Sequence, residues 1–142
     1  MIEVKEALVQ QDKKYNMEDI KVYIASPYTK GWMPTNVRLQ LETADELIEL
    51  GYIPYTPLLT HFQEIYSSRE EHVWLRIDFA FLKTCNAVLR LKPVGKDGKE
   101  IPSVGADQEV ELAEKEGIPV FYTIEELNNY FKAKSTQAKL NI

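Results

Sequence analysis

The feature that most constrains the fold is an alternation of short apolar runs with helical segments. The four runs are residues 20–26, 52–57, 86–91 and 118–122. They are rich in β-branched and aromatic residues, and proline or a polar turn follows each of them. Because the runs are continuously apolar rather than alternating, they are typical of strands buried on both faces of a parallel sheet.

Helical spacing of apolar side chains fills the intervals between these runs. The predicted helices are residues 37–50, 70–84, 104–116 and 123–134. Gly51 ends the first of them, and a capping box of Thr123 and Glu126 begins the last. Residues 58–70 predict a loop or a short helix, and the Gly- and Pro-containing residues 92–102 predict a loop or hairpin.

Strands that alternate with helices in this way form a parallel sheet covered on both faces. We therefore expect an α/β fold, with a flavodoxin-like or Rossmann-like open parallel sheet of four to five strands. The chain divides into an N-terminal extension (1–19), one domain (20–134) and a C-terminal tail (135–142). In such sheets ligands bind beyond the carboxyl ends of the strands, which directs the search for a site to the loops there.

Composition excludes several classes of function. The 142-residue chain has a net charge of −5 and no Lys/Arg cluster, so we expect no polymeric nucleic acid partner. No apolar run is long enough to span a bilayer, and residues 1–14 lack the apolar core of a signal peptide. We therefore expect a soluble, cytoplasmic protein without a membrane partner. The single Cys85 lies in an apolar helical run, which favours a buried structural thiol over a reactive one.

Common cofactor motifs are missing from the sequence. There is no P-loop, no Gly-x-Gly-x-x-Gly after the first strand and no Gly-x-Ser-x-Gly elbow. His61, His72 and Cys85 have no zinc-binding spacing, so we expect neither a metal nor a cofactor.

The helix at 104–116 is crowded with carboxylates. Asp107, Glu111 and Glu114 share a solvated face, whereas Glu109 is offset toward a side with small residues. Glu109 therefore lies at the edge of a pocket, unless the predicted phase of this helix is wrong and the side chain is exposed to solvent. Ser103 just before this helix is either a plain N-cap or part of an anion site at the helix N-terminus.

Three other residues are candidates for chemistry. Asp78 lies among Ile, Phe and Leu residues, where a carboxylate is either paired with Arg76 or another neighbour, or part of a site. Tyr23 lies within the first strand, where tyrosine usually serves packing. His61 follows the second strand and is either a loop residue or a base.

Three segments, taken in order, resemble the nucleoside 2-deoxyribosyltransferase superfamily, which includes 2'-deoxynucleoside 5'-monophosphate N-glycosidases. They are KVYIASPYT (21–29), WLRIDFAFLKTCNAVLRL (74–91) and PSVGADQEVELAEKEGIPVF (102–121). The last contains a Ser-x-Gly-x-x-x-Glu motif. The resemblance covers roughly residues 20–127.

The resemblance implies a role for each matching residue. Glu109 matches the nucleophilic glutamate that attacks the anomeric carbon, and Asp78 the aspartate that assists the leaving base. Tyr23 matches the tyrosine that helps to hold the nucleophile. The implied ligand-binding residues are Ser26 in the loop after the first strand and Ser103 with Gly105 in the late motif. We add His61 as a binding candidate because it follows the second strand, at the carboxyl edge of the sheet.

Two departures from the family pattern concern the substrate. The phosphate-binding arginine expected two residues after Ser26 is Tyr28 here, and the second glycine of the late motif is Asp107. A 5'-phosphate would therefore need Lys30, Arg38 or the helix N-terminus alone. Ser103, by contrast, resembles the monophosphate hydrolases more than the transferases.

The resemblance implies an enzyme that cleaves or exchanges the N-glycosidic bond of a (deoxy)nucleoside or nucleoside 5'-monophosphate. The alternatives are a non-catalytic Rossmann-like nucleotide-binding or sensor module and an accessory protein whose site has decayed. Because family members build their sites across subunit contacts, it also implies a homodimer or larger homo-oligomer. Trp32, Tyr66 and Trp74 are candidates for interface anchors or for core.

Overall fold

A computed structural model describes residues 19–140, with side chains described to residue 135. The predicted N-terminal extension lies outside the described residues, apart from Asp19. The elements are β1 (Lys21–Ala25), α2 (Met33–Glu49), β2 (Ile53–Tyr55), the 3-10 helix η1 (Pro57–Leu59), α3 (Thr60–Tyr66), α4 (Glu71–Leu82), β3 (Ala87–Arg90), α5 (Val104–Lys115), β4 (Val120–Phe121) and α6 (Ile124–Leu140).

The four strands form one parallel sheet in the order β2-β1-β3-β4. Tyr23 of β1 is in register with Tyr55 on one side and Val88 on the other. This is the order in which a flavodoxin-like sheet places its first four strands. The expected open parallel α/β sheet is therefore confirmed, with β1 and β3 in its centre.

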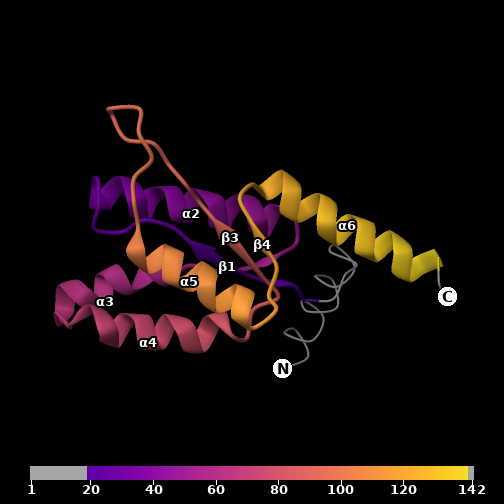
Figure 1. Cartoon of the computed structure of the whole chain (residues 1–142), viewed down its shortest axis with the longest axis horizontal. Coiled ribbons are helices and arrows are strands. Elements are labelled where there is room, and N and C mark those ends of the chain that lie inside the picture. Colours follow the sequence, from indigo (N-terminus) through magenta and orange to yellow (C-terminus); the bar gives the residue numbers. More distant parts are fainter. Residues whose placement is uncertain (1–18, 141–142) are drawn as a thin grey trace, which may run out of the picture.

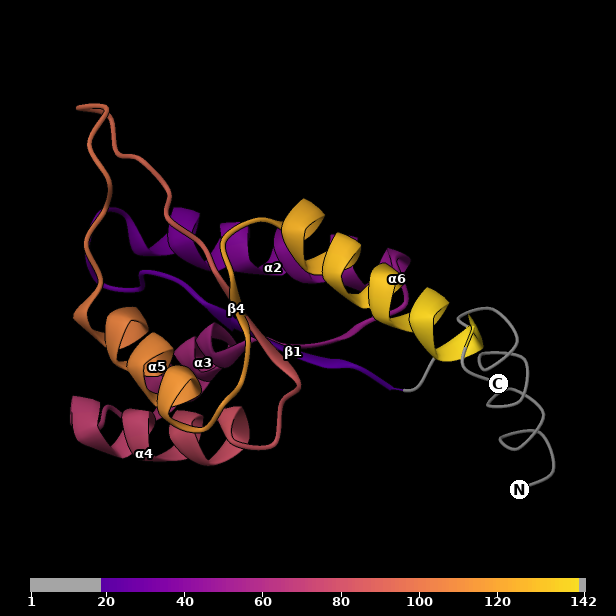
Figure 2. The same cartoon turned by 45° about the vertical axis from the view of Figure 1, so that its right-hand side comes forward.

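Helices cover both faces of the sheet. Helices α2 and α6 lie on one side, and α3, α4 and α5 lie on the other, in two views of the molecule (Figures 1 and 2). The core is split accordingly, because successive strand residues point to opposite faces. The side toward α2 and α6 buries Val22, Ile24, Ala44, Leu47, Tyr52, Ala87, Leu89 and Leu127. The side toward α4 and α5 buries Tyr23, Ala25, Leu82, Cys85, Val88, Ala106 and Ala113.

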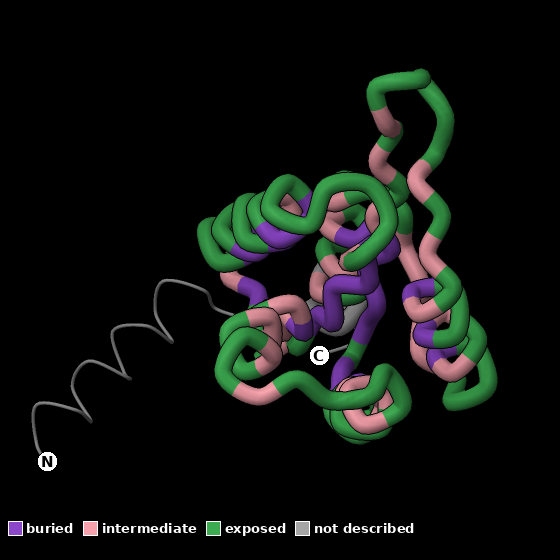
Figure 3. Tube along the Cα trace, turned by 90° about the vertical axis from the view of Figure 1, so that its left-hand side faces the viewer, coloured by how far each residue is buried: buried purple, intermediate pink, exposed green. Residues whose placement is uncertain are grey.

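The segment between β3 and α5 projects from the body of the domain as a hairpin, which we call the 92–102 hairpin (Figure 1). Its two arms are joined by an antiparallel bridge between Val94 and Glu100, and most of its residues are exposed (Figure 3). At its base Ile101 packs closely on Gly31, whose φ of 80° suits glycine. The hairpin alternative for this segment is thereby confirmed.

The remaining boundaries follow local chemistry. Gly51, with a φ of 95°, ends α2, and Thr123 caps α6 by accepting a hydrogen bond from the Glu126 amide at 3.1 Å. Residues 57–66 form η1 and α3, as the short-helix alternative predicted. Helix α6 continues past residue 134, where we expected the domain to end, as far as Leu140.

Two of the aromatic residues considered as interface anchors are exposed and one is not. Trp32 and Tyr66 present 69% and 87% of their surface to solvent. Trp74 is instead partly buried, and its indole donates a 2.6 Å hydrogen bond to Glu64, which ties α4 to α3. Cys85 is buried and contacts the Phe81 carbonyl at 3.5 Å, as expected of a structural thiol.

Candidate active site

Three of the candidate residues come together on the side of the sheet that faces α4 and α5. Tyr23 projects from β1, Asp78 lies on α4 and Glu109 lies on α5. The two carboxylates raise the pKa of the Tyr23 hydroxyl, and Asp78 raises the pKa of Glu109. Such mutual effects require the groups to be close. We call Tyr23, Asp78 and Glu109 the carboxylate cluster.

Glu109 is buried, with 6% of its surface exposed, on the same face of α5 as Ala106 and Ala113. The inward helical phase expected for Glu109 is therefore confirmed, while Asp107, Glu111, Glu114 and Glu116 remain exposed. Burial raises the pKa of Glu109, the nearby Tyr23 hydroxyl lowers it, Asp78 raises it and Arg90 lowers it, and together these effects place the pKa at about 8. One carboxylate oxygen, Oε2, has no hydrogen-bond partner in the described protein.

Asp78 is less deeply enclosed. Burial raises the pKa of its carboxyl group to about 7, and its Oδ1 lacks a hydrogen-bond partner among the described residues. Within residues 19–135 it forms no ion pair, so the expected alternative of a salt bridge with Arg76 is wrong. A buried and a partly buried acid whose pKa values are raised toward neutrality can exchange protons near pH 7, which makes the pair a candidate for acid–base chemistry.

Tyr23 is fully buried, and burial together with the two carboxylates raises the pKa of its hydroxyl far above the ordinary value. The hydroxyl therefore stays protonated. It faces Glu109 closely enough to lower the pKa of that carboxyl, although neither Oη nor Oε2 completes a hydrogen bond with any described residue. Its ring lies 5.5 Å from that of Tyr55, which in turn stacks on Phe81 at 4.8 Å.

Ser26 lies at the end of β1 and is buried by a side chain that sequence reasoning missed. The Gln40 amide donates to Ser26 Oγ at 2.8 Å and to the Ile24 carbonyl at 3.2 Å, and it accepts from the Leu58 amide at 2.9 Å. Gln40 thereby joins the end of β1 to η1. Its signal in the sequence was a polar residue between Val37 and Ala44 on the buried stripe of α2.

Ser103 caps α5, because its hydroxyl accepts a hydrogen bond from the Ala106 amide at 3.1 Å. The N-cap alternative is confirmed, and the serine remains partly exposed. Gly105 follows in the first turn of α5. A methyl group there would meet only Leu75, at an ordinary 3.8 Å, so packing within the chain does not require glycine at this position.

His61 lies outside the carboxylate cluster, at the beginning of α3. Its Nδ1 is hydrogen-bonded to the Tyr28 hydroxyl, and the two rings meet edge to face at 5.6 Å. The pair joins the loop after β1 to the segment after β2 at the carboxyl edge of the sheet. Of the cations considered for a 5'-phosphate, Arg38 pairs instead with Glu42 at 2.7 Å on the exposed face of α2, and Lys30 is exposed in the loop after β1.

Arg90 is the second residue that sequence reasoning missed. It ends β3 in register with Ala25, and only 1% of its surface is exposed. Its guanidinium donates to the Leu91 carbonyl and, at 3.0 Å, to Asp107 Oδ1, while Nε has no partner in the described protein. In the sequence, the signal was a cation inside the apolar run NAVLRL.

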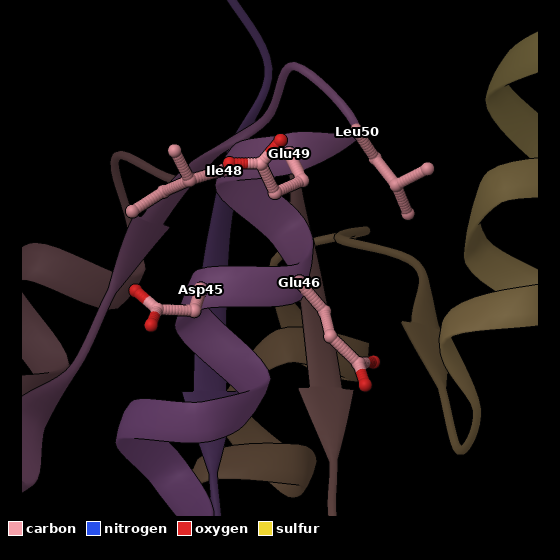
Figure 4. Close-up of a pocket in the computed structure, with 5 residues that line it drawn as sticks. All are labelled: Asp45, Glu46, Ile48, Glu49 and Leu50. Atoms are coloured by element: carbon pink, nitrogen blue, oxygen red, sulfur yellow. The ribbon is translucent and has the colours of Figure 1, made fainter.

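Two hollows of the surface are lined by residues outside the carboxylate cluster. One, at the end of α2, is lined by Asp45, Glu46, Ile48, Glu49 and Leu50 (Figure 4). The other is a groove between α4 and α5 whose apolar lining includes Leu75, Phe79 and Leu112. Tyr23 and Glu109 themselves are enclosed, with 0% and 6% of their surface exposed. Among the described residues, no group of three or more His, Cys, Asp or Glu is placed to hold a metal ion.

The comparisons with known proteins identify a family without assigning an activity. No curated protein matches the chain. Across the part of the chain that the structure describes, no helix is long and apolar enough to cross a membrane. Residues 20–123, which include every residue of the carboxylate cluster, match a family known as "Domain of unknown function (DUF7768)". The chain belongs to this DUF7768 family.

Proposed function

We propose that this protein is an N-glycosidase or 2-deoxyribosyltransferase-like enzyme that cleaves or exchanges the N-glycosidic bond of a (deoxy)nucleoside or nucleoside 5'-monophosphate. The observation that carries the proposal is the meeting of Glu109, Asp78 and Tyr23 from three separate elements in a buried cluster. The resemblance to the nucleoside 2-deoxyribosyltransferase superfamily assigns a role to the same three residues.

The proposed reaction uses the two carboxyl groups in different protonation states. Ionised Glu109 attacks the anomeric carbon of the sugar, and the bond from that carbon to the base nitrogen breaks. Protonated Asp78 gives its proton to the leaving base. The product is a glycosyl ester on Glu109, as in retaining glycosidases.

The second half of the reaction restores both carboxyl groups. Asp78, now a carboxylate, removes a proton from water as the water oxygen attacks the anomeric carbon, and the Glu109 ester bond breaks. The protein then acts as a hydrolase. If the nitrogen of another base attacks instead, Asp78 takes the proton of that nitrogen and the protein acts as a transferase.

Tyr23 supports this chemistry without reacting. Because its hydroxyl stays protonated, it can donate to an oxygen of ionised Glu109, and donation stabilises the carboxylate form. The enclosure of the cluster implies that the surrounding loops move when a nucleoside enters. No metal or cofactor is part of the proposed mechanism.

A panel of nucleosides and 5'-monophosphates, ribo and deoxy, tests the proposal by detection of free base and of base exchange. We expect base release by the wild type from at least one substrate. Glu109→Gln should reduce the rate at least about a thousandfold because it removes the nucleophile, and Asp78→Asn about a hundredfold because it removes the general acid and base. Glu111→Gln is the matched control, since it removes an exposed carboxylate from the same helix.

If the wild type neither releases nor exchanges any base in this panel, the enzyme proposal is wrong. The second candidate, a non-catalytic nucleotide-binding or sensor module, is favoured by the enclosure of Tyr23 and Glu109 within the domain. It predicts that a nucleotide raises the unfolding temperature without turnover, and that Glu109→Gln still binds.

We also propose that the protein acts on small molecules in the cytoplasm as a homodimer or larger homo-oligomer, without polymeric nucleic acid or a membrane. The oligomer is supported by apolar side chains on η1 and α3, where Leu59, Phe62, Ile65 and Tyr66 are between 48% and 87% exposed. Sedimentation equilibrium measures the state, and Phe62→Ser should weaken the association. A wild-type monomer at all concentrations would contradict it.

A further inference from the structure

The proposed function, on which this inference rests, requires Glu109 to be ionised while Asp78 keeps its proton. Burial works against that assignment, because it raises the pKa of both carboxyl groups, and with its neighbours included Glu109 has a pKa of about 8, against about 7 for Asp78. Any group that favours a negative charge on Glu109 therefore matters for the proposed reaction.

The groups that face Glu109 come from three elements packed against α5. Tyr23 comes from β1, Asp78 from α4 and Arg90 from β3. Tyr23 is neutral and Asp78 is an acid, so Arg90 is the cation among them. Because its guanidinium is always charged and is withdrawn from water, its effect on a neighbouring carboxyl is only weakly screened.

Two hydrogen bonds fix the position of the Arg90 guanidinium. It is held at the end of β3, where Nη1 donates to the Leu91 carbonyl and Nη2 donates to Asp107 at 3.0 Å. Among the described residues, the third donor position, Nε, is buried without a partner, and so is Oε2 of Glu109. A buried donor and a buried acceptor that both lack partners are costly, and a contact between them would remove both costs.

Asp107 also interacts with the Arg90 guanidinium, but its side chain is exposed to solvent whereas that of Glu109 is buried. It lies two residues before Glu109 on α5, and 65% of its side chain is exposed, against 1% for Arg90. An exposed carboxylate gains little from an ion pair, because water solvates it well. The pair therefore holds Arg90 in place while leaving much of its charge uncompensated inside the protein.

We propose that Arg90 is a positioning residue that lowers the cost of a negative charge on Glu109, and that Asp107 limits this effect by competing for the guanidinium. The cation lies at the end of the central strand β3, which contacts α5, so it acts before any substrate binds. Loss of Arg90 should strengthen proton binding at Glu109, and loss of the Asp107 charge should weaken it.

The first test titrates the Glu109 side-chain carboxyl carbon by NMR, with the resonance assigned by its loss in Glu109→Gln. Arg90→Gln should raise the midpoint by about one pH unit or more, which is a tenfold gain in proton affinity. Arg90→Lys should restore most of the wild-type midpoint. Asp107→Asn should lower the midpoint by about half a unit, and the control Glu111→Gln should leave it unchanged.

A double-mutant cycle shows whether Asp107 acts through Arg90. If it does, Asp107→Asn shifts the midpoint in the wild type but not in Arg90→Gln. An unchanged midpoint in folded Arg90→Gln overturns the proposal, and so does an equal Asp107→Asn shift in both backgrounds. Should Arg90→Gln fail to fold, Asp107→Asn alone decides, and an unchanged or raised midpoint overturns the proposal.

The NMR titration requires no substrate, so it separates failure of this inference from failure of the proposed function. Where base release is detected, the acid limb of kcat/KM should move with the same sign as the midpoint in each variant. Shifted midpoints in a protein that releases no base would support the role of Arg90 and contradict the proposed enzyme.

Discussion

At the scale of the residue, Glu109 combines a requirement for function with a cost in stability. It sits on the inner face of a helix whose other inward side chains are Ala106 and Ala113, and one of its oxygens has no partner. A carboxylate in such surroundings loses its hydration, so the folded protein prefers the neutral acid. The charge that the proposed reaction needs is therefore opposed by the fold that holds it.

This cost predicts that Glu109→Gln stabilises the protein in a pH-dependent way. The pKa of Glu109 is 4.5 in the unfolded chain and about 8 in the folded one, so between these values the folded state binds more protons. Stability then falls as pH rises through this window, and glutamine avoids the loss. We expect Glu109→Gln to gain about 2–4 kcal/mol over wild type on going from pH 5 to pH 9.

Urea unfolding of both proteins at pH 5, 7 and 9 measures this difference. Glu111→Gln is the control, because its exposed carboxylate should give a difference from wild type that is nearly constant with pH. A Glu109→Gln difference that is equally constant would show that Glu109 ionises normally in the folded protein. That result would contradict the burial argument on which its role depends.

At the scale of the element, α5 places two parts of the site through its first turn. Ser103 satisfies the amide of Ala106, and Asp107 in the same turn pairs with Arg90 on β3. Together these contacts fix the rotation of α5 about its axis, and that rotation directs Glu109 inward. The Ser103 cap and the Arg90–Asp107 ion pair therefore help to orient Glu109, although neither Ser103 nor Asp107 belongs to the carboxylate cluster.

Removal of the cap should loosen this turn. We expect Ser103→Ala to lower the free energy of unfolding by about 1 kcal/mol, and to speed amide exchange in residues 104–107. Thr123→Ala, which removes the comparable cap of α6, is the matched control with a similar cost. It should leave exchange in α5 unchanged. Equal exchange in the first turn of α5 for wild type and Ser103→Ala would show that the cap does not hold it.

Elements were more predictable from sequence than the contacts among them. The apolar runs and helical spacing determine a parallel α/β sheet because they reflect burial, which is periodic along the chain. The phase of α5 was readable for the same reason, since small residues flank Glu109 at helical spacing. Arg90 and Gln40 were missed because polar side chains are buried only when partners distant in sequence satisfy them. Asp107 and Leu58 are such partners, and no local pattern identifies them.

At the scale of the whole molecule, the strand order explains why residues far apart in sequence meet. The order β2-β1-β3-β4 places β1 and β3 side by side, and right-handed connections carry α4 and α5 to one face of them. Tyr23, Asp78, Arg90 and Glu109 are thus brought together although the sequence separates the outermost two by most of the domain. The 92–102 hairpin projects from this arrangement of sheet and helices and is not part of it (Figure 2).

Because the 92–102 hairpin projects from the sheet and its helices, we expect it to be shortened with little loss of stability. Replacement of residues 94–100 by a short glycine-containing turn should change the free energy of unfolding by less than about 1 kcal/mol, because loop length contributes little and neither core cluster includes this segment. Ile101, which packs on Gly31, is retained in the shortened protein. Cooperative urea unfolding with an unchanged midpoint is the expected result. A decrease of several kcal/mol in the free energy of unfolding would show instead that the hairpin tip stabilises the loops at the carboxyl edge of the sheet, and that the stability of the domain depends on it.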